Sequence, residues 1–218
     1  MNAASPLATR TRLDRIIAIN CGATPHLALA FLPARTVFAN TLAVFPLDTH
    51  AAFCTLQSRP HEIWARFFGS SMKDDLRYTP SDVFETFPFP IGWTADPALE
   101  AAGEAYYSFR ADLMRGNGEG LTKTYNRFHD ADERDPDIAR LRELHAGMDR
   151  AVLKAYGWSD IDASCEFLLE YEIDEEQWSS KRKKPWRYRW PDPVRDEVLA
   201  RLMELNAERA EEERRACE

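Results

Sequence analysis

The sequence predicts an α+β fold, with a small partial β-sheet at the N-terminus followed by a mainly helical C-terminal region. Two observations lead to this prediction. Residues 13–47 are rich in branched and aromatic side chains and are interrupted by glycine and proline, which is typical of short strands. From residue 48 onward, apolar residues recur at the spacing of amphipathic helices. The composition, 44% hydrophobic and 29% charged, is that of a soluble globular protein.

The predicted strands lie within the stretches LDRIIAIN, HLALAFLP and TVFANTLAVFPL, which Gly22, Pro25 and Pro33 separate. A sheet of about three short strands cannot cover itself. We therefore expect helices to pack on the sheet, or the sheet to be the remnant of a larger one.

The first predicted helix follows Asp48, which suits an N-cap, and Pro60 should kink or divide it. Its apolar positions are Phe53, Leu56, Ile63, Trp64, Phe67 and Phe68. A second helix should begin at Asp96 and Pro97 and stop at the glycines of GNGEG, residues 116–120.

Further helices are predicted over LTKTYNRF and from Pro136 to near Gly157. CEFLLEYEI is either a short strand or an irregular buried segment. The last helix should begin at Asp192 and Pro193, and its polar tail, AERAEEERRACE, should fray. We predict two domains, a partial recognition domain over residues 1–92 and a helical domain over residues 93–218.

The net charge of −8 argues against a bulk electrostatic attraction to nucleic acid. The acidity is confined to the second part, because residues 1–90 carry 8 basic and 7 acidic residues. A DNA-binding surface must therefore depend on local residues. The sequence also contains no apolar run of the roughly 20 residues that a membrane helix requires. Four cysteines without a CxxC pair suggest neither a disulfide framework nor a zinc site, so we expect a cytoplasmic protein.

No catalytic or metal-binding residues can be assigned, because the sequence lacks the GxSxG, HExxH, GxxxxGK[ST] and GxGxxG patterns. His61 and Glu62, beside Arg59, could form a site, but a helix surface explains them equally well. His145 falls among the apolar positions of its helix and is interpreted as a core histidine rather than a ligand.

The segment GSSMKDDLRYTPSDVFETFPFP, residues 69–90, combines a polar loop with an aromatic strip. The loop offers hydroxyls, cations and a phenol that suit phosphates and base edges: Ser70, Ser71, Lys73, Arg77 and Tyr78. A solvated connecting loop is the alternative interpretation. The strip should anchor the loop to a neighbouring element through Phe84, Phe87 and Phe89.

The run KRKKPWRYRW, residues 181–190, is the second candidate for DNA contacts, because it interleaves basic and aromatic residues. Its candidate contacts are Lys183, Lys184 and Arg187. An exposed basic loop, balanced by the acidic EIDEE just upstream, explains the composition equally well.

The chain resembles the C-terminal part of MmeI-like type IIL restriction–modification enzymes, which combine a nuclease, an adenine-specific DNA methyltransferase and a target-recognition domain. The resemblance lies in LQSRPHEIWARFFGSSMKDDLRYTPSDVFETFPFP and LRELHAGMDRAVLKAYGW, and in the arginine- and tryptophan-containing run before the last helix. It extends from about residue 15 to residue 209.

The resemblance implies a DNA-recognition fragment or split subunit that contacts double-stranded DNA. The family's Asn-Pro-Pro-Tyr tetrapeptide, glycine-rich S-adenosylmethionine loop and nuclease signature do not occur in this sequence. We therefore expect the chain to be inactive alone and to hold no cofactor. S-adenosylmethionine is expected on a separate catalytic methyltransferase chain or on a missing catalytic domain.

The chain is expected to begin inside the recognition domain, which would leave a sheet edge open to self-association. A protein-interaction module that docks on a methyltransferase subunit without DNA contact is an alternative. An independent hydrolase with an unrecognised site is another.

Overall fold

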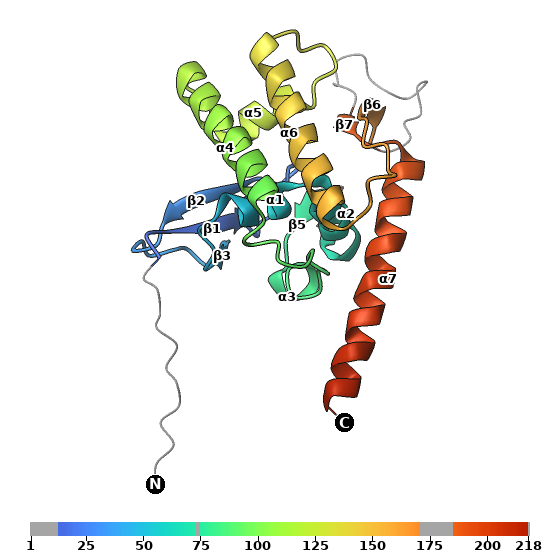
Figure 1. Ribbon diagram of the computed structural model, residues 1–218. Coiled ribbons are helices and arrows are strands. Elements are labelled where there is room, and N and C mark those ends of the chain that lie inside the picture. Colours follow the sequence, from blue (N-terminus) through green and yellow to red (C-terminus); the bar gives the residue numbers. More distant parts are fainter. Residues whose placement is uncertain (1–12, 73–74, 171–184, 218) are drawn as a thin grey trace.

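The computed structural model of the chain describes residues 13–72, 75–170 and 185–217. A small antiparallel sheet at the N-terminal end is followed by a mostly helical region, which confirms the predicted α+β fold (Figure 1).

The N-terminal sheet has the strand order β2-β1-β3. Strand β1 (Arg15–Asn20) lies between β2 (Leu29–Pro33) and β3 (Leu42–Phe45), and both pairings are antiparallel. Ile17 and Ile19 of β1 are buried in the main hydrophobic core. The three strands lie within the stretches in which the sequence predicts them.

One edge of this sheet is closed by side chains from the helices. The backbone N–H of Leu29 donates to Oε1 of Gln57 at 2.9 Å, and the carbonyl of Leu29 accepts from Arg110 at 2.7 Å. The N–H of Phe31 donates to the hydroxyl of Tyr107 at 3.3 Å. Because these groups of β2 are already bonded, an added strand could not use them. Self-association through a sheet edge would therefore have to use β3.

The first predicted helix is divided, as Pro60 indicated, into α1 (His50–Gln57) and α2 (Arg59–Phe68). The N-cap of α1 is Thr49 rather than Asp48, because the Thr49 hydroxyl accepts from the backbone N–H three residues later at 3.2 Å.

Two long helices, α4 (Pro97–Asn117) and α6 (Pro136–Ala155), lie side by side (Figure 1). Each begins with a proline that follows a capping aspartate, as the sequence predicts for the start of α4. Helix α4 also packs closely on α1. A Cβ atom added at Gly103 would overlap the carbonyl oxygen of His50 and lie 3.0 Å from Cβ of Cys54.

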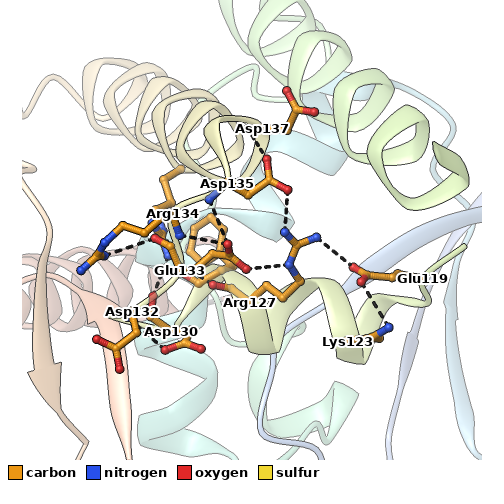
Figure 2. A network of polar contacts seen from close by, with 11 residues as sticks. Glu119, Lys123, Arg127, Asp130, Asp132, Glu133, Arg134, Asp135 and Asp137 are labelled. Carbon is orange, nitrogen blue, oxygen red and sulfur yellow. Dashed lines mark hydrogen bonds and ion pairs between the residues drawn. The ribbon is translucent and has the colours of Figure 1, made fainter. Parts of the chain in front are cut away.

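The predicted short helix is α5 (Leu121–Phe128), and an ion-pair network joins it to the start of α6 (Figure 2). Arg127 contacts Glu119 at 3.4 Å, Glu133 at 2.7 Å and Asp135 at 2.6 Å. The hydrogen bond from Arg127 lowers the pKa of Glu133 to about 2. These contacts fix the connection between the two helices.

The C-terminal part contains a hairpin and a long helix. Strand β6 (Glu166–Leu169) pairs with β7 (Trp186–Arg189). Strand β7 was not predicted from the sequence, because its residues belong to the basic run. Helix α7 (Asp192–Cys217) runs past α2 (Figure 1). It is helical through Cys217, where fraying was predicted. Asn206 and Arg209 donate to the backbone carbonyls of residues 86 and 89, each at 2.6 Å, and these bonds hold the helix at the start of its polar tail.

The hydrophobic core is continuous from Ile17 to Leu202 and includes residues on both sides of the predicted domain boundary at residue 92. That boundary stays a prediction. In the part of the chain that the structure describes, no helix is long and apolar enough to cross a membrane.

Candidate nucleic-acid interface

The predicted recognition loop is a short hairpin. Strand β4 (Ser70–Met72) pairs with β5 (Asp75–Arg77) in a register that places Ser70 opposite Arg77 and Ser71 opposite Leu76. The N–H of Leu76 donates to the carbonyl of Thr24 at 2.8 Å, and the N–H of Thr24 donates back at 3.0 Å. The hairpin is thus bonded to the loop after β1.

Arg77, the last residue of β5, is exposed. Its two neighbours in sequence, Leu76 and Tyr78, are 3% and 1% exposed. Among the described residues, no hydrogen bond or ion pair engages the Arg77 guanidinium group. A free guanidinium on a backbone fixed from both sides is available to a phosphate or a base edge.

The other predicted residues of this hairpin are placed differently. Lys73 lies outside the described residues, and so do the side chains of Ser70 and Ser71. Tyr78 is buried, and its hydroxyl lies 3.1 Å from Nε2 of His61. The structure therefore argues against the predicted DNA contact of Tyr78, because the Tyr78 hydroxyl is buried and has its hydrogen-bond partner inside the protein.

The three phenylalanines predicted as anchors belong to one aromatic cluster that follows the short helix α3 (Pro80–Val83). The ring of Phe84 stacks on Phe45 of β3 with centroids 4.5 Å apart. Phe87 is 4% exposed, and its ring centroid lies 6.0 Å from that of Trp64 on α2. Phe89 contacts Phe87 at 4.9 Å. The rings thus connect the segment to the sheet and to α2, and their role as an anchor stays a prediction that mutation can test.

The second predicted recognition segment is partly described. Lys183 and Lys184 lie outside the described residues. Arg187, on β7, is 5% exposed and donates to the carbonyl of Pro25 and to Nδ1 of His26, the latter at 2.9 Å. The structure argues against the predicted DNA contact of Arg187, because Pro25 and His26 hold its side chain in the interior. These partners lie about 160 residues earlier in the chain.

A cavity of about 350 Å³ lies between α2, β7 and α7. Its arginines are paired with carboxylates: Arg66 contacts Glu62 at 2.9 Å and Glu170 at 3.3 Å, and Arg187 contacts Glu170 at 2.8 Å. Burial alone would raise the pKa of Glu62, but Arg66, His129 and Arg59 lower it to about 2. The cations of this cavity are therefore neutralised within the protein, unlike Arg77.

A buried charge cluster joins α2 to α6. The Asp149 carboxylate forms an ion pair with Arg59 and accepts from the Arg59 backbone N–H at 2.8 Å. His145 is 3% exposed, and its Nδ1 accepts from the Arg59 guanidinium at 2.8 Å, so it is a satisfied core histidine as predicted. His61 is fully buried, which corrects its interpretation as a helix-surface residue. In the described ranges, no three His, Cys, Asp or Glu side chains are placed to hold a metal ion.

The family described as "MmeI, target recognition domain" matches residues 10–91, which include the whole β4–β5 hairpin and the three phenylalanines. The resemblance to MmeI-like proteins is confirmed.

A solved structure of the type IIL restriction–modification enzyme MmeI in complex with DNA has a similar fold, with a TM-score of 0.54 and 17% sequence identity. The match covers 89% of this chain and 21% of the MmeI chain, so this chain spans about a fifth of that protein's length. No curated protein matches the chain.

Proposed function

We propose that this chain is the DNA-sequence-recognition part of an MmeI-like restriction–modification system for adenine methylation. It would act on double-stranded DNA in the cytoplasm as a fragment or split subunit. Two findings support the proposal. Residues 10–91 match the target recognition domain of MmeI, and the MmeI structure of similar fold is in complex with DNA.

The observation on which the proposal chiefly depends is the placement of Arg77. This exposed cation lies on the matched segment, and its buried neighbours Leu76 and Tyr78 fix its backbone. An arginine can donate two hydrogen bonds to O6 and N7 of guanine, or it can contact a phosphate. Ser70, Ser71 and Lys73, on the same loop, are proposed as further contacts, and Lys183 and Lys184 as contacts from the second segment.

We propose that the methyl transfer itself is carried out by a catalytic part outside these residues, on a separate chain or on a missing catalytic domain. The sequence contains neither the adenine-binding tetrapeptide nor the S-adenosylmethionine loop of the family, and the chain spans about a fifth of the MmeI chain. We expect the purified chain to transfer no methyl group to DNA and to bind no S-adenosylmethionine. Micromolar cofactor binding in calorimetry would contradict this expectation.

Titration of Arg77→Ala with DNA tests the recognition role. The parent chain first selects its preferred duplex from a randomised pool, and both proteins are then titrated with that duplex and its single-base variants. If Arg77 reads a guanine, the variant loses about 1–3 kcal/mol at one base position. If Arg77 contacts phosphate, the loss is uniform over sequences and the salt dependence falls by about one ion.

Arg150→Ala is the matched control, because Arg150 is an exposed arginine on α6, outside the matched segment. The control should bind like the parent. An Arg77→Ala variant that binds every duplex as the parent does would remove the hairpin from the recognition surface.

A second candidate function is a protein-interaction module that docks on the methyltransferase subunit or on a second copy of the chain. The observation that favours it is exposed apolar surface: Val44 on β3, an edge strand of the described sheet, is 38% exposed, and Phe67 near the end of α2 is 54% exposed. Light scattering of the purified chain tests whether the partner is a second copy of the chain. Concentration-dependent dimers that Val44→Lys abolishes would indicate self-association through β3, and a monomer at high concentration would exclude it.

A further inference from the structure

His61 and Tyr78 form a fully enclosed hydrogen-bonded pair beneath the β4–β5 hairpin. His61 is 0% exposed and Tyr78 is 1% exposed. Nδ1 of His61 lies 2.7 Å from the carbonyl oxygen of Leu56, and the Tyr78 hydroxyl lies 3.1 Å from Nε2 of His61. A carbonyl oxygen can only accept, so Nδ1 carries the proton, and Nε2 must accept from the Tyr78 hydroxyl.

The protonation of both groups agrees with this arrangement. Burial lowers the pKa of His61 to about 4, so its ring is neutral at pH 7. Burial also raises the pKa of the Tyr78 hydroxyl, which therefore keeps its proton and remains a donor. The chain of bonds thus runs in one direction, from Tyr78 through His61 to the carbonyl of Leu56 at the end of α1.

This bond chain fixes the backbone on one side of Arg77. On the other side, Leu76 is buried and exchanges two backbone hydrogen bonds with Thr24. Arg77 therefore lies between two residues whose positions are determined by partners in α2 and in the loop after β1. A binding side chain loses affinity when the residues that support it are free to shift.

We propose that Tyr78 and His61 are positioning residues for Arg77, which hold its guanidinium group in the orientation that contacts DNA. The proposal rests on the function proposed above. This role explains why Tyr78 points into the protein next to Arg77. The Tyr78 hydroxyl gives the backbone just after β5 a directional hydrogen bond, which packing of the ring alone would not supply.

A double-mutant cycle between Arg77 and Tyr78 tests this role. The full chain and the variants Arg77→Ala, Tyr78→Phe and the double variant are titrated with a fluorescein-labelled duplex that the parent chain selected from a randomised pool. Circular dichroism first establishes that every variant is folded at the titration temperature. Tyr78→Phe keeps the ring and removes only the hydroxyl.

We expect Tyr78→Phe to weaken binding about three- to tenfold in the parent and to have no effect when Arg77 is already alanine. A residue that only stabilises the fold would not produce this dependence on Arg77. His61→Gln, which perturbs the same pair from its other end, should behave like Tyr78→Phe and replaces it if that variant does not fold.

The outcomes separate this inference from the proposed function. If Arg77→Ala weakens binding and Tyr78→Phe does not, the positioning role is wrong and the DNA contact stands. Equal losses from Tyr78→Phe with and without Arg77 would also contradict the positioning role. If neither substitution changes binding, both proposals are overturned.

Discussion

Replacing Asp149 by alanine should be among the most destabilising single changes in this protein. The carboxylate is 0% exposed and accepts from two groups at once, the Arg59 guanidinium and the Arg59 backbone N–H. Arg59 itself is 4% exposed. The substitution therefore leaves a buried cation without its carboxylate partner and the first N–H of α2 without its acceptor, which costs about 3–5 kcal/mol.

Urea denaturation followed by circular dichroism measures this loss. The midpoint should fall steeply while the slope, which reflects the surface exposed on unfolding, stays unchanged. A double variant, Arg59→Met with Asp149→Leu, should recover much of the loss, because it removes both charges of this buried pair.

The matched control is Asp160→Ala. Asp160 forms an ion pair with Arg201 at 2.7 Å, but its side chain is 63% exposed. Water screens such a pair, so the control should unfold at the parent midpoint. An Asp149→Ala variant that also unfolds at the parent midpoint would refute the view that this cluster connects α2 to α6.

Three further predictions concern packing and pH. Phe87→Ala removes a ring that is 4% exposed and should cost about 3–5 kcal/mol in urea denaturation, whereas Ile91→Ala, at a residue 92% exposed, should cost nothing measurable; equal midpoints would contradict the anchor role. Gly103→Ala forces a methyl group into the carbonyl of His50 and should cost about 1–3 kcal/mol or more, and a variant as stable as its parent would show that α1 and α4 can separate freely. Because the pKa of His61 falls from 6.5 to about 4 on folding, the unfolded chain takes up a proton first, and stability should decrease as the pH falls from 6.5 towards 4. Urea midpoints that do not change over this range would contradict the buried, neutral state of His61.

Much of the fold could be predicted from local sequence. Strand positions followed from branched and aromatic runs, and the break between α1 and α2 followed from Pro60, because such signals act through neighbouring residues. The strand β7 could not be predicted in this way. Its sequence, WRYR, reads as a basic loop, and it becomes a strand because it pairs with residues about 20 positions earlier.

The candidate site shows the same limit. Residue types indicate a polar loop followed by an aromatic strip, but they show neither that the loop forms a hairpin nor which polar groups face inward. Tyr78 is buried because its acceptor, His61, lies 17 residues earlier on α2. His61 is buried because the aromatic cluster covers α2 on that side, with the ring of Phe87 4.9 Å away. Contacts between distant segments decide these orientations, and no local pattern records them.

Arg77 and Arg187, the two arginines predicted to contact DNA, lie in opposite environments. They differ in whether hydrogen-bond acceptors of the protein surround the guanidinium group. Arg187 forms ion pairs with carboxylates and donates to a backbone carbonyl of the same protein. These contacts connect β7 to the loop after β1. Arg77 has buried neighbours but no described acceptor of its own. A substitution at Arg187 therefore exposes unsatisfied buried groups and reduces stability, whereas a substitution at Arg77 leaves the fold intact.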